Sequence, residues 1–171
     1  MGDIIHSNGL CRNCGLCCDG TLFVHGVLAA DDDMQPWQGT ALETVAGEIR
    51  YPEPCRHFSH DHCTIYSQRP ACCRGFRCAL LQRVENGEVE QSAAAAIVRQ
   101  TRQLADIVKP WLIEVTGGNA TQSFRQLSRK IDALPMQPDA ATQQRHLQLG
   151  TLAITLQRYF EVPERTDGNE D

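Results

Sequence analysis

Two cysteine-rich stretches decide the fold of this chain: residues 11–18 read CRNCGLCC and residues 63–78 read CTIYSQRPACCRGFRC. Together with Cys55 they contain all nine cysteines of the 171 residues. An odd number of cysteines cannot pair completely as disulfides within one chain. The sequence also starts without the basic segment and long apolar core of a secretion signal. We therefore expect free thiols, a cytoplasmic location and a local chemical purpose for the cysteines.

The composition argues against nucleic acid and membranes as partners of this protein. A net charge of −5 and a pI of about 5.6 argue against nucleic acid, because neutralising phosphates requires a basic face. No run approaches the roughly 20 apolar residues that a membrane helix needs, so no membrane partner is expected. Metal ions are the expected partners, and a protein partner bound through the second half of the chain is an alternative.

The first stretch offers three thiolates, Cys11, Cys14 and Cys17, at intervals of three residues. Bacterial ferredoxins use the same run to hold three corners of a four-iron cluster. A single C-x-x-C pair is weaker evidence, since zinc knuckles and thioredoxin-like motifs share it. Cys18 follows Cys17 directly, and neighbouring side chains usually diverge. One of the two is therefore expected to serve a second centre, or both to touch different atoms of a polynuclear cluster.

The second group of cysteines is expected to fold back over the first, because a tetrahedral centre needs four ligands. This group comprises Cys55, Cys63, Cys72, Cys73 and Cys78. Three histidines lie between Cys55 and Cys63: His57, His60 and His62. They are interpreted as ligands that replace a thiolate, as outer or transient ligands, or as members of a polar loop. Five arginines near cysteines are either counter-ions of the thiolates or ordinary surface residues: Arg12, Arg56, Arg69, Arg74 and Arg77.

Only short elements are expected in the cysteine-rich half. They are, in order, a strand within residues 21–28, a helical turn over 42–45, a strand over 48–51 and a loop-like segment over 52–78. Gly15 and Gly20 supply the backbone freedom of tight loops around a metal. Because residues 11–78 are poor in large aliphatic side chains, we expect this half to be largely disordered without metal.

The second half predicts helices. Their expected ranges are 79–84, 91–116, 121–134 and 140–160. The apolar stripe of the longest helix is traced through Ala94, Ile97, Leu104, Val108, Trp111 and Val115. Thr101 interrupts this stripe, and Pro110 is expected to kink or split the helix because it lacks an N–H donor.

The sequence thus predicts a mainly α, α+β protein. A cysteine-rich, loop-rich, metal-binding half with one or two short strands packs on a bundle of about three helices. The expected divisions are a flexible arm at 1–10, a cysteine-cluster region at 11–90, a helical region at 91–162 and a disordered tail at 163–171.

The two stretches resemble the YkgJ-type cysteine-cluster family, also called the CxxCxxCC zinc- or iron-chelating domain. The family pattern falls on eight cysteines of this sequence: Cys11, Cys14, Cys17, Cys18, Cys55, Cys63, Cys73 and Cys78. It also falls on Ile65, Tyr66, Arg69, Pro70 and Arg74. Cys72 is an extra thiol outside the pattern. The resemblance implies metal binding by those eight cysteines.

The identity of the metal stays open between zinc and iron, the latter including an iron–sulfur cluster. The ferredoxin-like triplet favours iron, whereas the histidines and the absence of a Cys-Pro ending favour zinc. A related domain in flagellin lysine methylases implies an alternative, a cluster-dependent redox or group-transfer enzyme. The chain has no G-x-G-x-x-G fingerprint of a nucleotide site, and no catalytic residue is identified. A zinc-organised protein-interaction module is the other alternative.

Overall fold

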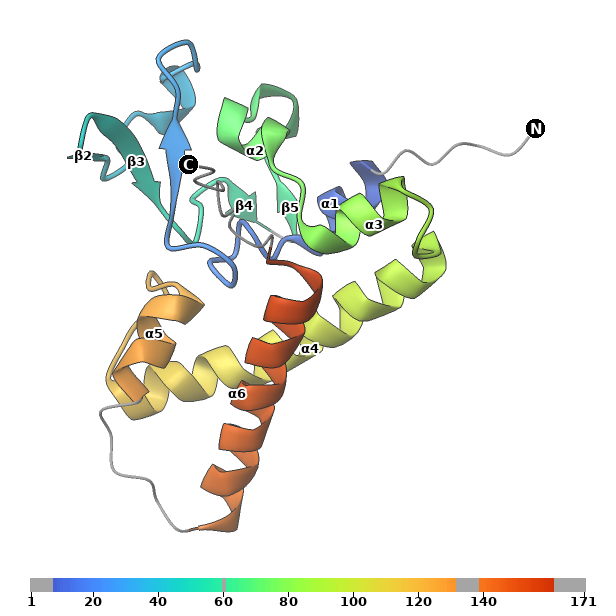
Figure 1. Ribbon diagram of the computed structural model, residues 1–171. Coiled ribbons are helices and arrows are strands. Elements are labelled where there is room, and N and C mark those ends of the chain that lie inside the picture. Colours follow the sequence, from blue (N-terminus) through green and yellow to red (C-terminus); the bar gives the residue numbers. More distant parts are fainter. Residues whose placement is uncertain (1–7, 60, 132–138, 162–171) are drawn as a thin grey trace, which may run out of the picture.

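The computed structural model describes residues 8–59, 61–131 and 139–161. The protein is of the α+β class: two small antiparallel sheets and short helices form the N-terminal half, and long C-terminal helices pack together (Figure 1). This confirms the expected fold class. Within the described residues, no helix is both long enough and apolar enough to cross a membrane. The expected tail at 163–171 lies outside the described residues.

The first sheet has the order β1–β3–β2 and is antiparallel throughout. Its strands are β1 (His25–Leu28), β2 (Glu43–Val45) and β3 (Glu48–Pro52). The helical turn expected at 42–45 is wrong, since these residues form β2. The reason is the two-residue connection of Ala46 and Gly47, which both have positive φ, +52° and +85°. Such a connection joins antiparallel strands as a hairpin and pairs Val45 with Glu48.

The segment expected to be loop-like, residues 52–78, contains several very short elements. A two-stranded ribbon pairs β4 (Phe58–Ser59) with β5 (His62–Cys63). Single turns of 3-10 helix lie at Tyr66–Gln68 and, earlier in the chain, at Gln35–Trp37. Helix α2 (Ala71–Gly75) begins directly after Pro70 and carries Cys72 and Cys73.

Helix α1 (Asn8–Cys14) corrects two expectations. The flexible arm expected at 1–10 does not extend to Leu10, which is helical and buried, and the first part of the cysteine motif is helical rather than a loop. The three-residue spacing of Cys11 and Cys14 suits one face of a helix. Gly15, with φ of +70°, ends α1 in the left-handed conformation that glycine adopts most readily.

The remaining helices are α3 (Ala79–Glu85), α4 (Gln91–Thr116), α5 (Phe124–Ile131) and α6 (Ala140–Tyr159). The range predicted for the longest helix is confirmed, yet Pro110 does not split it. Helix α4 packs against both α5 and α6, and this packing sustains the helix across the missing hydrogen bond. Its buried face comprises Ala94, Val98, Thr101, Ala105, Val108 and Leu112. It shares Ala94 and Val108 with the predicted stripe, includes Thr101, which was expected to interrupt the stripe, and elsewhere lies one residue later.

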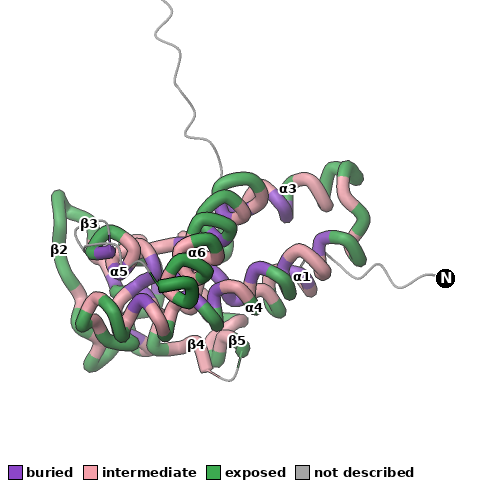
Figure 2. The backbone as a smooth tube through the Cα atoms, turned by 90° about the horizontal axis from the view of Figure 1, so that it is seen from below, coloured by how far each residue is buried: buried purple, intermediate pink, exposed green. Residues whose placement is uncertain are grey.

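The cysteine motif is built into the main hydrophobic core. Leu10, Leu16 and Leu22, which flank and interrupt the first motif, belong to the same buried cluster as Val108 of α4 and Leu152 of α6. Figure 2 marks buried positions along α4, where α1 and α6 contact it. The helices therefore fix the position of the first cysteines, although these lie far from α6 in the sequence.

Candidate metal centre

Helix α1 and the turn that follows it hold the four cysteines of the first motif. Cys11 and Cys14 lie on α1, and Gly15 then turns the chain so that Cys18 and Asp19 both donate backbone hydrogen bonds to its carbonyl oxygen, each at 2.9 Å. A Cβ atom at Gly15 would lie 2.5 Å from the ring of Phe58. Only a residue without a side chain fits this corner, where the ribbon β4–β5 packs against the motif.

Cys78 joins three of these thiols from the other side. It caps the N-terminus of α3, where its Sγ accepts a hydrogen bond from the backbone N–H of Leu81 at 3.4 Å. A cavity of about 60 Å³ is lined by the thiols of Cys11, Cys14, Cys17, Cys18 and Cys78 and otherwise largely by apolar side chains. Burial raises the pKa of Cys14 to about 12, and the neighbouring thiols Cys78 and Cys11 add to this increase.

The pKa values of Cys17 and Cys78 are raised for the same reasons, first by burial and then by the other thiols around this cavity. At Cys11, Arg69 and Arg77 oppose the effect of burial on the pKa. The charges of these two arginines thus act on Cys11, although Arg77 also pairs with Glu85 and Arg69 lies over the ring of Tyr66. We define the first set as Cys11, Cys14, Cys17 and Cys78.

Cys18 turns toward a different group. The backbone N–H of Cys55 donates to the carbonyl oxygen of Cys18 at 2.8 Å, which ties the second cysteine-rich region to the first. Burial raises the pKa of Cys18, and the neighbouring acidic groups of Glu53, Cys55 and Cys63 raise it further. Burial also raises the pKa of Cys55 to about 12, again with contributions from Glu53 and Cys63. Cys18, Cys55 and Cys63 therefore form a second neighbourhood.

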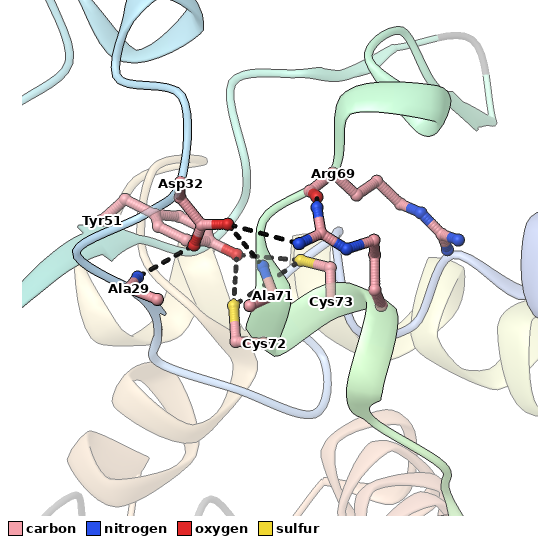
Figure 3. Close-up of polar contacts among 8 residues, drawn as sticks. Ala29, Asp32, Tyr51, Arg69, Ala71, Cys72 and Cys73 are labelled. Atoms are coloured by element: carbon pink, nitrogen blue, oxygen red, sulfur yellow. Dashed lines mark hydrogen bonds and ion pairs between the residues drawn. The ribbon is translucent and has the colours of Figure 1, made fainter.

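Cys72 and Cys73 approach this neighbourhood from α2, with their Sγ atoms 3.9 Å apart (Figure 3). The hydroxyl of the buried Tyr51 lies 3.1 Å from Cys73 Sγ and 3.6 Å from Cys72 Sγ. The hydrogen bond within the pair lowers the pKa of Cys72 to about 6 and raises that of Cys73. The pair thus favours a single negative charge. Because Cys18 also raises the pKa of Cys73, we define the second set as Cys18, Cys55, Cys63 and Cys73.

Asp32 fixes the start of α2. Its carboxylate accepts hydrogen bonds from the backbone N–H groups of Ala71, at 2.8 Å, and Ala29, at 2.9 Å, and lies 3.7 Å from the guanidinium of Arg74 (Figure 3). Tyr51 is fixed in turn by Trp37, whose ring centroid lies 4.1 Å from its own. The Cys72–Cys73 turn is therefore held from the sheet side by two buried side chains.

A larger cavity of about 250 Å³ is lined by Cys18 and Cys73 of the second set, whereas Cys55 and Cys63 line neither cavity. The thiols of Cys11, Cys17 and Cys18 line both cavities, so the two cavities adjoin. The larger one is also lined by Cys72, Cys73, Tyr51, Glu53, His25 and Arg69. Burial raises the pKa of Glu53 to about 9; a hydrogen bond from the backbone of Cys55 opposes this, and the neighbouring acidic groups Asp19 and Cys72 reinforce it.

Of the histidines predicted as candidates, His57 and His62 are not part of either cavity lining. His57 packs edge-on against Trp37 with 4.9 Å between ring centroids, and burial lowers its pKa. His62 is exposed, and His60 lies outside the described residues. Two other predicted counter-charges have structural contacts instead: Arg56 donates to the carbonyl oxygen of Gln38, and Arg12 lies over the ring of Tyr66.

All nine cysteines are free thiols. The fold brings the two cysteine-rich stretches to the same pair of cavities, but no three His, Cys, Asp or Glu side chains in the described parts of the chain are placed to hold one metal ion. Sequence reasoning missed Tyr51, Glu53 and Asp32. No motif marks them, because their contacts to the cysteine regions are made between segments far apart in the sequence.

Comparison with protein families gives a match over more than half of the chain. The CxxCxxCC family, for which zinc or iron chelation is proposed, matches residues 10–106. This range covers α1 to the middle of α4 and includes every cysteine discussed above. Comparisons with curated proteins and with solved structures give no match. The resemblance that the two cysteine stretches indicated is thus confirmed, and the chain belongs to the CxxCxxCC family.

Proposed function

We propose that this protein chelates zinc or iron through eight cysteine thiolates arranged as two centres. The first centre uses the first set, Cys11, Cys14, Cys17 and Cys78. The second centre uses the second set, Cys18, Cys55, Cys63 and Cys73. Eight thiolates supply two complete four-ligand shells, and the one cysteine left over is Cys72, which lies outside the family pattern.

The observation that carries this proposal is that thiols from both cysteine-rich stretches line two adjoining cavities, Cys78 in the smaller one and Cys72 and Cys73 in the larger one. The pKa of Cys17 responds to Cys14, Cys11 and Cys78, and also to its neighbour Cys18. The pKa of Cys18 responds instead to Cys55 and Cys63, with Cys11 contributing last. Although Cys17 and Cys18 both line the two cavities, the thiols that contribute most to their pKa values differ, which supports two centres sharing one wall.

The donors fit the metals. Thiolate sulfur is a preferred ligand of Zn²⁺ and of iron–sulfur clusters, and metal binding is what converts such buried thiols to thiolates. The buried thiols have raised pKa values in the absence of a cation, and the Oε2 atom of Glu53 has no hydrogen-bond partner among the described residues. A bound cation would balance the negative charge of the thiolates and would give the Oε2 atom of Glu53 a partner. When bound, zinc would supply structural cross-linking and iron–sulfur clusters would supply one-electron transfer.

Anaerobic purification with elemental analysis and visible absorption tests the proposal. We expect two equivalents of zinc in a colourless protein, or iron with matching sulfide in a brown one. Substoichiometric metal after anaerobic reconstitution with either zinc, or iron and sulfide, would overturn the proposal. The two positive results separate the zinc form from the iron–sulfur form.

A further inference from the structure

Glu53 lies where the first sheet meets the cysteine motif. Its backbone N–H donates to the carbonyl oxygen of Val24 at 3.0 Å. The next residue, Pro54, packs against Gly20, where an added Cβ atom would lie 3.0 Å from the proline nitrogen. The backbone is therefore held on both sides, and the side chain lines the larger cavity together with Cys18.

The carboxyl group of Glu53 is buried and incompletely compensated. The residue is 5% exposed, and Oε2 has no hydrogen-bond partner in the described residues. Its acidic neighbours include Asp19 and the thiols of Cys18 and Cys55. The cation that acts on it is Lys109, whose ammonium already donates to the carbonyl oxygen of Asp19. Burying an anion among other acidic groups is costly unless a cation or a proton balances it.

We propose that Glu53 supplies a carboxylate oxygen ligand to the metal centre of the second set, so that this centre has a mixed sulfur–oxygen shell whereas the first centre is bound by thiolates alone. This inference rests on the proposed function. Zn²⁺ binds carboxylate oxygen as well as thiolate, and its coordination can expand from four to five ligands, as it does at catalytic zinc sites. Glu53 is thus a fifth donor beside Cys18, Cys55, Cys63 and Cys73.

X-ray absorption of the zinc-loaded wild-type protein tests this without any substitution. Zinc–sulfur distances of about 2.3 Å and zinc–oxygen distances of about 2.0–2.2 Å are resolved as separate shells. We expect a minor oxygen shell that disappears in the Glu53→Gln variant. A sulfur-only shell in a wild-type protein that holds two zinc ions would overturn the role of Glu53 and leave the two thiolate centres standing.

Cobalt(II) titration supplies the second measurement. The Glu53→Gln variant keeps the side-chain volume. We expect one of its two cobalt ions to bind at least about tenfold more weakly, because even the loss of an outer partner of a metal ligand has an effect of that size. Its visible bands should intensify, because tetrahedral cobalt absorbs more strongly than five-coordinate cobalt. Glu43→Gln, at an exposed position of the same sheet, is the matched control and should bind both ions as the wild type does.

The outcomes separate the two proposals. If wild-type protein binds no stoichiometric cobalt, the proposed function itself fails. If wild type and Glu53→Gln bind two ions with equal affinity and identical bands, Glu53 is a protonated structural group and this inference fails alone. A folding defect is recognised from the first centre: in Glu53→Gln it should bind its own ion as tightly as in the wild type, because its cysteines pack on the main hydrophobic core.

Discussion

The two cysteine sets use the same atom type in different surroundings. The first set is carried by α1, by the turn after it and by the N-terminus of α3, all packed on the main hydrophobic core. Apart from Cys18, which follows Cys17 in the turn after α1, the second set is carried by a two-residue strand, a loop and the five-residue α2. Cys18 and Cys73 of this set line a cavity about four times as large. From this difference we expect the helices to hold the first set in place without metal, and the second set to need a bound metal for its order.

Metal removal should give the largest effect and should act unequally on the two regions. A structural zinc ion contributes about 10–16 kcal/mol to folding, which is comparable to the stability of a whole domain. We expect a chelator to expose residues 52–78 to protease while α4 and α6 remain helical. Limited proteolysis with far-ultraviolet circular dichroism measures both. Unchanged cleavage and melting after complete metal removal would contradict this expectation.

Single serine substitutions should divide the eight cysteines into the two sets. Cys14→Ser should lose one metal equivalent and lower the melting temperature, and Cys78→Ser should reproduce this result. Cys63→Ser should lose the other equivalent, with a smaller change in melting because its ribbon is peripheral to the core.

The measurement is metal content by elemental analysis together with thermal unfolding. Cys72→Ser should keep both metal equivalents, because this thiol lies outside the family pattern, and should lower only the affinity of the second centre, because Cys72 contacts Cys73 Sγ. Retention of two equivalents in Cys14→Ser, or loss of both in Cys63→Ser, would contradict the division into two sets.

Packing under the first set should be the next most sensitive feature. Leu16 is completely buried between the cysteines of the first motif. Leu16→Ala should therefore cost about 2–5 kcal/mol, the range for large-to-small changes in a core. Denaturant unfolding of the metal-loaded protein measures this cost. Leu147→Ala, at an exposed position of α6, should change the stability by no more than about 0.5 kcal/mol. Equal costs for the two substitutions would show that the motif is not part of the core.

The sequence predicted the helices better than the supports of the metal centre. Apolar periodicity identified α4 with its correct limits. The adjacency of Cys17 and Cys18 predicted that one of them serves a second centre or that both touch different atoms of one cluster, and this stays a prediction. The interpretation of α1 as a loop was wrong, because Gly15 suggested a turn throughout the motif when it in fact ends a helix. Local pattern thus identified the long helix and the ligand types.

The contacts that hold the second set could not be predicted, because they join residues far apart in the chain. Asp32 caps the start of α2 through Ala71, which is 39 positions away. Tyr51 reaches Cys73 across 22 positions. Neither contact follows from residue spacing, since each depends on how the first sheet packs against α2. Such partners of metal ligands emerge only when the topology is known.

Tyr51→Phe should give the smallest effect and should be confined to the second set. The substitution removes one oxygen atom and keeps the ring that packs on Trp37, so the contact with Cys73 Sγ is lost without opening the core. Loss of such an outer partner typically weakens metal binding by about 10–100-fold, or about 1.4–2.7 kcal/mol. Competition with a chromophoric chelator should show this loss at one of the two sites, while Tyr159→Phe on α6 leaves both unchanged. Equal weakening of both sites would mean that Tyr51 supports the fold as a whole, and that the two sets are more tightly coupled than their separate supports suggest.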